Sequence, residues 1–162
     1  MQSGSARGIV KFTSENPLKA LFIMPDGDFD SYVKSFDSVE YSKLLDSVDY
    51  TKRQTALIPP FQTEAVTADI SPVLQKIGLY NLFDENSSFA NMAHSDGLTL
   101  NKFYDSIPSL SVCAQGIAVS AATSDSALKE TADGDAWVFD KPFIFMLVDN
   151  ETNIPIYIST IE

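Results

Sequence analysis

The side chains best suited to chemistry in this chain are a short run of acidic residues, one histidine and one cysteine. Asp26, Asp28 and Asp30 alternate with other residues as in the first half of a calcium-binding loop. Such a loop needs glycine at its sixth position and an oxygen ligand or its water further on, where this chain has Ser31 and Lys34. We therefore interpret the acidic residues as favourable charges at the start of a helix, not as a metal site.

The histidine and the cysteine do not belong to a recognisable catalytic group. His94 lies in a polar stretch, and the chain has no Gly-x-Ser-x-Gly turn that would present a nucleophilic serine. Cys113 ends an alternating, strand-like pattern, where a small apolar side chain suits a buried position. There is also no phosphate-binding loop or dinucleotide motif. The sequence thus predicts a protein that is not an enzyme and uses no cofactor or metal.

Composition and charge exclude several partners. The 162 residues are 44% hydrophobic and 20% charged, which is typical of one globular domain. The net charge is -11 and the 11 Lys and Arg residues are dispersed, so we expect no binding to nucleic acid. No apolar run approaches the ~20 residues that span a bilayer, so we expect no membrane partner. The first residues, MQSGSARG, contain no hydrophobic core of a signal peptide.

The segment that stands out lies between Ala114 and Phe145. Residues 117–136 are small, polar and acidic, so they cannot bury enough apolar surface to offset the entropy of ordering, and we expect an exposed, mobile loop. Long loops inside a compact domain are usually functional or linkers. The start of this loop lacks bulky groups, so it can also become a strand if a sheet accepts it. In a strand, alternate residues would share a face: Ile117, Val119, Ala121 and Thr123 on one side, Ala118, Ser120, Ala122 and Ser124 on the other.

The elements around this loop suggest a mixed, mainly antiparallel architecture, the α+β class. Apolar runs and alternation predict strands over residues 8–13, 18–24, 50–58, 61–66, 98–112, 137–148 and 154–161, with a bulge at Pro108. Helical spacing predicts a helical region over residues 29–48, broken near Asp37. A shorter helix is expected to begin with Ser71 as N-cap and to end at Gly78, with Val73, Leu74 and Ile77 on its buried face and Leu79, Leu82 and Phe83 packed in the core behind it.

Four segments in this order resemble the C-terminal part of a serpin, the family of metastable inhibitors of serine and cysteine proteases. They are Leu57-Ile58-Pro59-Pro60-Phe61, then Ile70 to Phe83 (ISPVLQKIGLYNLF), Phe139 to Phe145 (FDKPFIF), and Ile154 to Ile161 (IPIYISTI). The resemblance covers nearly the whole chain, residues 1–161. One such match would be weak, but four in order and spacing are specific. The resemblance implies a single serpin-like C-terminal region over residues 1–162, without the N-terminal half of the fold.

The resemblance also implies the functional residues. The hinge of the reactive loop would be Gln115, Gly116, Ile117, Ala118, Val119, Ser120, Ala121, Ala122 and Thr123. A target serine or cysteine protease would cut near Lys129, Glu130 or Thr131, which we call the bait region. The loop would then insert into a sheet as a new strand and trap the covalently attached protease. Lys129 suits a trypsin-like enzyme and Glu130 a glutamate-selective one.

Two interpretations follow from the length of the chain. In the first, it is part of a protease inhibitor and acts with the N-terminal half of the serpin fold as a second partner. In the alternative, it is a non-inhibitory, serpin-like binding or structural protein with an exposed loop. Asp125 and the pair Ala114-Gln115, which stands where acidic residues usually precede the hinge glycine, are departures that favour the alternative. The resemblance also suggests an extracellular location.

Overall fold

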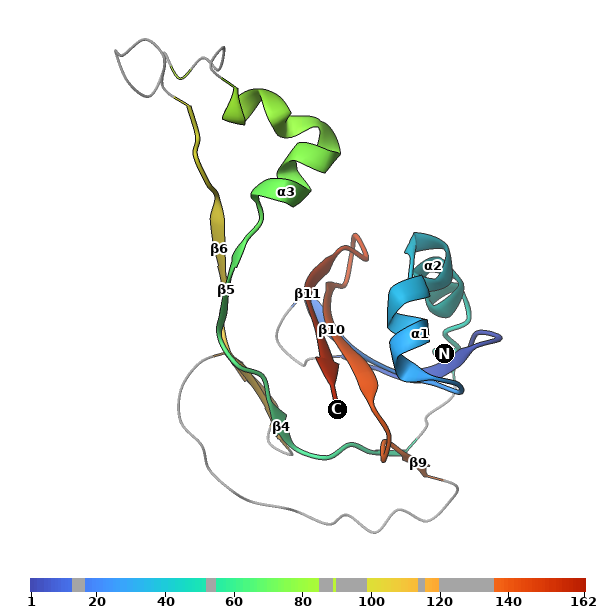
Figure 1. Cartoon of the computed structure of the whole chain (residues 1–162). Coiled ribbons are helices and arrows are strands. Elements are labelled where there is room, and N and C mark those ends of the chain that lie inside the picture. Colours follow the sequence, from blue (N-terminus) through green and yellow to red (C-terminus); the bar gives the residue numbers. More distant parts are fainter. Residues whose placement is uncertain (13–16, 52–54, 85–88, 90–98, 114–115, 120–135) are drawn as a thin grey trace. The chain divides into compact units, whose positions relative to one another are not determined.

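The computed structural model describes residues 1–12, 17–51, 55–84, 89, 99–113, 116–119 and 136–162 (Figure 1). The chain forms two compact units. Unit 1 comprises Met1–Phe61, Cys113–Gly116 and Ser124–Glu162, and unit 2 comprises Gln62–Val112 and Ile117–Thr123. Mostly antiparallel strands and a few short helices make up these units, which confirms the predicted α+β class. Within the described residues, no helix has the length and apolar character needed to cross a bilayer.

Unit 1 is built on a four-stranded antiparallel sheet with the order β1-β2-β10-β11. Its strands are β1 (Ala6–Phe12), β2 (Leu18–Pro25), β10 (Phe143–Asp149) and β11 (Pro155–Ile161). The two central strands come from opposite ends of the chain, and their register places Phe22 opposite Phe145. Strands β1, β2 and β11 begin and end within two residues of their predicted positions.

The central strands β2 and β10 are covered on both faces. Their sequences, LKALFIMP and FIFMLVD, are almost uninterrupted apolar runs, and nearly every residue in them is buried. On one face, Leu21, Ile23, Ile144, Met146 and Val148 form a core with side chains from two helices. The apolar run in β2 therefore correctly predicted a strand that is buried on both sides.

The two helices on this face are α1 (Phe29–Ser35) and α2 (Ser38–Asp46), which stand beside the sheet in Figure 1. Each begins with an aspartate cap: the Asp28 carboxylate accepts a hydrogen bond from Ser31 N at 2.9 Å, and the Asp37 carboxylate accepts from Val39 N and Glu40 N. Such caps satisfy N–H groups that the helix leaves unpaired. The break predicted near Asp37 is confirmed, because Asp37 is extended and starts the second helix.

An aromatic cluster covers the opposite face of the sheet. The rings of Phe22, Phe143 and Phe145 meet there with those of Phe139 and Phe61, at centroid distances of 5.2–6.3 Å. Edge-to-face and tilted geometries of this kind add to the stabilisation from burial. The segment Phe139 to Phe145 is thus a structural anchor for the end of the long loop.

Two short strands flank this anchor. Strand β3 (Ala56–Leu57) pairs in parallel with β9 (Trp137–Val138), so β9 is separate from β10 and the single strand predicted over residues 137–148 is wrong. Asp140 and Pro142 lie between the two pieces, where a charge and a missing N–H interrupt a ladder. Of the strand predicted over residues 50–58, the described residues form only β3, and Tyr50 and Thr51 lie in a turn.

Unit 2 contains an antiparallel pair formed by β5 (Val66–Asp69) and β6 (Tyr104–Ile107). Between them lie the helix α3 (Ser71–Leu74), a π-helical turn (Gln75–Leu79) and a 3-10 turn (Tyr80–Phe83). Gly78 has a φ of 99°, so the left-handed residue predicted at the end of the helix is confirmed. Strand β7 (Leu110–Cys113) follows β6 after the interruption predicted at Pro108.

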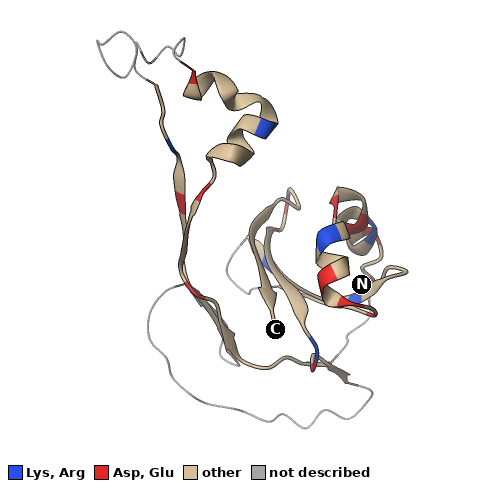
Figure 2. Cartoon of the chain, in the orientation of Figure 1, with Lys and Arg blue, Asp and Glu red and all other residues tan. Residues whose placement is uncertain are grey.

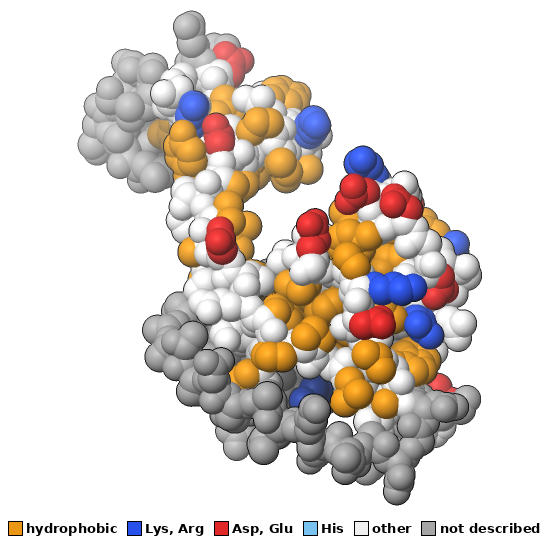
Figure 3. All heavy atoms as spheres, turned by 60° about the horizontal axis from the view of Figure 1, so that its bottom comes forward, with side chains coloured by type: hydrophobic (Ala, Val, Ile, Leu, Met, Phe, Trp, Pro, Cys, Tyr) orange, Lys and Arg blue, Asp and Glu red, His pale blue; other side chains and the backbone are white. Residues whose placement is uncertain are grey.

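Two expectations for unit 2 are wrong. Ser71 is the first helical residue rather than the cap: its N–H donates to Asp69 Oδ1, and its hydroxyl accepts from Phe103 N. The helix face expected to be buried is largely exposed, since Val73 and Ile77 are 57% and 68% accessible and Leu79 is exposed as well. Leu74, Leu82 and Phe83 are half-buried. Figure 3 shows hydrophobic side chains on the surface of both units. Within the described residues, unit 2 alone supplies no apolar layer to cover that face.

We predict that Gly8→Ala destabilises unit 1 while Gly27→Ala does not. A Cβ at Gly8 would clash with the carbonyl oxygen of Phe22 on the paired strand, whereas the space around Gly27 is open. Overpacking of this kind costs about 1–3 kcal/mol. Urea denaturation of both variants measures the effect, and equal stability of the two would contradict the close strand approach at Gly8.

Candidate functional site

The hinge predicted over residues 115–123 is described in part. Gly116, Ile117, Ala118 and Val119 form strand β8. Gln115, Ser120, Ala121, Ala122 and Thr123 lie outside the described residues, as do Lys129, Glu130 and Thr131 of the bait region and Asp125. The expectation that an exposed loop begins at Ile117 is therefore wrong for its first three residues, which belong to a sheet.

Strand β8 is hydrogen-bonded to β7 in a three-stranded sheet with the order β4-β7-β8, where β4 is Phe61–Gln62. Only Ala114 and Gln115 separate β7 from β8 in the chain. A connection this short joins antiparallel neighbours, because parallel strands need a crossover of a dozen or more residues. Strand β8 is therefore inferred to run antiparallel to β7.

The start of β7 is held by one threonine in unit 2. Thr63 N donates to Leu110 O at 2.8 Å, and Leu110 N donates back to Thr63 Oγ1 at 2.9 Å. Leu110 itself is buried. A hydroxyl thus replaces a main-chain carbonyl just after the interruption at Pro108, where regular pairing is lost. Sequence reasoning missed Thr63, and a threonine in a predicted strand carries no signal that would reveal this role.

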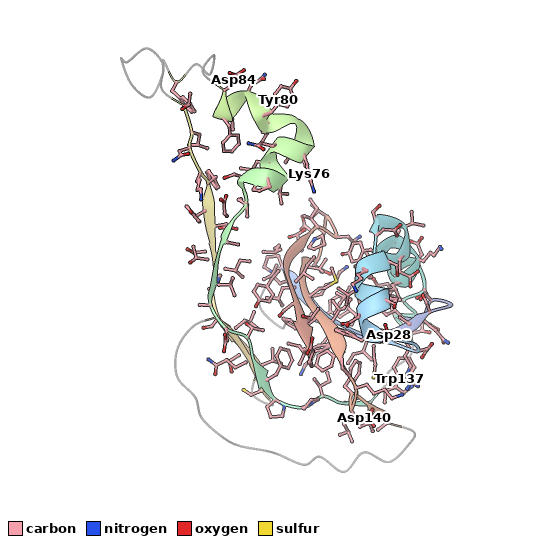
Figure 4. The ribbon with its side chains drawn as sticks, in the orientation of Figure 1. Asp28, Lys76, Tyr80, Asp84, Trp137 and Asp140 are labelled. Atoms are coloured by element: carbon pink, nitrogen blue, oxygen red, sulfur yellow. The ribbon has the colours of Figure 1, made fainter. Side chains whose placement is uncertain are left out.

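The residues after the loop are anchored within unit 1. Trp137 N donates to Thr55 O at 3.0 Å, and Phe139 N donates to Leu57 O at 2.9 Å. The Arg7 guanidinium lies 5.9 Å from the centroid of the Trp137 ring, a distance typical of a cation–π contact. Figure 4 labels Trp137 and Asp140. Phe139, which lies between them in the sequence, is buried. The chain is therefore fixed by main-chain pairing both before residue 120 and after residue 135.

A second polar cluster fixes the turn between β10 and β11. Asp149 Oδ1 accepts hydrogen bonds from Thr152 Oγ1 and Thr152 N, both at 2.7 Å, and these bonds lower the pKa of Asp149. The Lys19 ammonium donates to Asn153 Oδ1, and the Tyr41 hydroxyl donates to Asn153 O at 2.7 Å. Burial lowers the pKa of Lys19, while the nearby Asp149 raises it. This cluster ties the final hairpin to β2 and α2 and has no geometry suited to catalysis.

The other residues considered for a metal site or for catalysis are Asp28, Cys113 and His94. Asp28 caps α1, and its pKa is lowered by hydrogen bonds from the Ser31 side chain and backbone, which supports the interpretation of this acidic segment as the start of a helix. No group of three or more His, Cys, Asp or Glu side chains among the described residues is placed to hold a metal ion. Cys113 is a partly buried free thiol at the end of β7. His94 lies outside the described residues.

We predict that Thr63→Val loosens the start of β7. The substitution removes the acceptor of the Leu110 N–H, and an unsatisfied buried donor costs about 1–3 kcal/mol. Hydrogen exchange at the Leu110 amide should become faster. Thr67→Val is the matched control, since the Thr67 hydroxyl is exposed and lies 3.4 Å from Ser106 Oγ. If both variants leave exchange at Leu110 unchanged, Thr63 does not hold the strand.

Known proteins share this combination of sequence and fold. A family model described as serpin (serine protease inhibitor) matches residues 6–162. Serpin A9 of Homo sapiens is 27% identical over 108 residues, which are 65% of this chain and 25% of that protein. A serine proteinase inhibitor of Cavia porcellus is 24% identical over 147 residues, which are 91% of this chain and 35% of that protein.

Solved structures agree on the fold. The native state of tengpin, a thermophilic serpin, superimposes with a TM-score of 0.72 and 23% sequence identity, over 99% of this chain and 42% of tengpin. The chain thus spans between a quarter and about two fifths of the length of these relatives. Because the family model covers nearly every residue, from the first strand to the last, the chain belongs to the serpin family.

Proposed function

We propose that this chain is the loop-bearing part of a serpin-type protease inhibitor. In this proposal, the segment after Gly116 offers a bait bond near Lys129, Glu130 or Thr131 to a serine or cysteine protease, and then extends β8 along β7. The observation that carries the proposal is β8 itself. Its backbone already adopts a strand and pairs with β7 directly beyond Gly116.

The chemistry of the trap comes from the target protease. Its serine or cysteine side chain attacks the carbonyl carbon of the bait bond, the new acyl bond forms, and the C–N bond breaks as the leaving amine takes a proton. Water would normally hydrolyse the acyl bond. If the freed loop moves into the sheet before hydrolysis, the protease is carried with it and its active site is distorted. The chain supplies the acyl group and the strand, and no catalytic residue.

The composition of the hinge supports this movement. Ala118, Ser120, Ala121, Ala122 and Thr123 are small, so a strand made of them can enter a sheet without displacing bulky neighbours. Each main-chain hydrogen bond to β7 stabilises the inserted strand by about 0.5–1.5 kcal/mol. The conformational entropy lost when a residue is ordered costs a similar free energy, so pairing with β7 alone gives no net stabilisation. Insertion therefore needs a second neighbouring strand on the free edge of β8.

That second strand is the reason to propose a partner. In the described part of the chain, β8 has β7 as its only neighbour in the sheet. The N-terminal half of a serpin fold, on this chain's own polypeptide or on another, would supply the opposite edge. The inhibitor is then complete only with this second half, and the target protease is its other partner.

A non-inhibitory binding or structural protein is the second candidate. It is favoured by the same pairing, because β8 occupies the position beside β7 while the chain is uncleaved. It is also favoured by Asp125, which would fall on the same face as Ile117 and Val119 in an inserted strand that continued to residue 125. Burial of an unpaired carboxylate costs several kcal/mol and would stop insertion near that residue.

Incubation of the chain, together with the N-terminal half of the fold, with a trypsin-like and a glutamate-selective protease separates the two candidates. An inhibitor should form a covalent complex that survives denaturing electrophoresis, and Lys129→Ala or Glu130→Ala should abolish the complex with the matching protease. Lys141→Ala, which removes an exposed lysine outside the loop, is the control and should change nothing. Cleavage in the bait region with no complex would favour the non-inhibitory protein.

Thermal unfolding after the loop is cut gives an independent result. Insertion adds main-chain hydrogen bonds and buried area, so the melting temperature should rise clearly when the bait region is cleaved. Ala118→Arg places a charged side chain in the inserted strand and should prevent that rise, while cleavage still occurs. With the N-terminal half of the fold present, an unchanged melting temperature of the cleaved wild-type protein contradicts the trap.

A further inference from the structure

Strand β9, the first described strand after the bait region, is too short to be held by main-chain pairing alone. It consists of Trp137 and Val138, and it pairs with the two residues of β3. A two-stranded pair is marginally stable in water unless its side chains pack against other elements. Val138 is exposed, whereas Trp137 is half-buried. Trp137 is therefore the side chain through which β9 is attached to the rest of unit 1.

One basic side chain of β1 lies against the ring of this tryptophan. The Arg7 guanidinium, 5.9 Å from the centroid of the Trp137 ring, makes the cation–π contact. Ile9, two residues further along β1, lies opposite Phe22, so Arg7 projects from the sheet face that carries the aromatic cluster. Figure 2 shows the basic residues dispersed over the chain, and among the described residues Arg7 is the only one in cation–π range of this ring.

A carboxylate in unit 1 orients the guanidinium. Arg7 Nε lies 4.0 Å from Asp26 Oδ1, and the backbone of Asp26 is fixed because its N–H donates to Ser5 O at 3.0 Å. An exposed ion pair of this kind adds little stability. A planar guanidinium can, however, bind a carboxylate through its N–H groups and stack on an aromatic ring at the same time, which the ammonium group of lysine cannot do. Arginine is therefore suited to hold the Trp137 ring, and lysine is less so.

The position of Trp137 limits the chain on the amine side of the bait bond. A cut after Lys129, Glu130 or Thr131 leaves five to seven residues before Trp137. At no more than about 3.6 Å per residue, the new amino end stays within about 25 Å of Trp137 while β9 is held. In the proposed trap the acyl end leaves with the strand that extends β8. Attack of the amine on the acyl carbon, which would re-form the peptide bond and release the serine or cysteine of the protease, then becomes less frequent.

We propose that Arg7 is a positioning residue for the bait region. It holds the Trp137 ring, so that the chain on the amine side is anchored from Trp137 onward and not only from Phe139. This inference rests on the proposed function, because it gives the anchor a role in the trap. Arg7 acts through Trp137 and is not a catalytic residue. Without Arg7 the aromatic cluster still holds Phe139, so β9 detaches more often while the four-stranded sheet stays intact.

Hydrogen exchange resolved by residue, measured on the protein with the N-terminal half of the fold present, tests this role. Arg7→Leu should speed exchange of the Trp137 N–H about two- to fivefold, as expected for the loss of an exposed cation–π contact. Exchange in β2 should not change, which shows that the sheet remains folded. Lys11→Leu removes an exposed cation from the same face of β1 and is the matched control, with no effect at Trp137. Arg7→Lys should lie between Arg7→Leu and the wild type.

A double-mutant cycle separates the specific contact from a general effect on β1. In a Trp137→Leu background, Arg7→Leu should cause no further change in exchange at the amide of residue 137. An equal effect of Arg7→Leu in both backgrounds overturns the proposal, as does the absence of any effect in the wild-type background.

The rate of covalent complex formation tests the role of the anchor in the trap. Arg7→Leu should slow formation of the complex by up to the same about two- to fivefold, since the amine returns to the acyl carbon more often. Lys11→Leu should not slow it. An unchanged rate with Arg7→Leu overturns the role of Arg7 in the trap. If exchange responds as expected but the wild-type protein forms no complex with either protease, the contact stands and the proposed inhibitor function fails.

Discussion

The pairing of β2 with β10 is the interaction on which the rest of unit 1 depends. It joins residues 18–25 to residues 143–149, so more than a hundred residues of chain must leave the sheet and return to it. The pair is stable because both strands are apolar throughout and are covered by helices on one face and by an aromatic cluster on the other. Closing so long a connection costs entropy, and burial on both faces offsets it.

The pairing of β2 with β10 also limits the segment between β8 and β9. Because β9 and Phe139 are anchored beside the central pair, the loop that precedes them has one end held in unit 1. Its other end begins as β8, hydrogen-bonded to β7. In the proposed mechanism, the small residues after Gly116 allow backbone of this segment to pair with a sheet without disturbing the core. That property suits an inhibitor that uses its loop as bait, and membership of the serpin family confirms that the chain is not an enzyme.

Much of this could be predicted from the residues. Three strands of the four-stranded sheet follow from apolar runs and alternation, and the helix break follows from Asp37, whose carboxylate caps the second helix. Gly78 was predicted as a left-handed stop because only glycine adopts that conformation without strain. The family was identified from segments such as Phe139 to Phe145, whose aromatic pattern is specific. The bait region remains a prediction, since it lies outside the described residues.

Local sequence determined which segments are strands and helices, because side-chain spacing and caps act within a few residues. Tertiary structure alone decided the partners of those segments. Nothing in the sequence distinguishes β9 from β10, or shows that Ile117 begins in a sheet, since both depend on strands distant in the chain. The exposure of Val73, Ile77 and Ile158 was likewise unpredictable. An apolar pattern states that a face should be covered, whereas the presence of a covering layer depends on how distant elements pack.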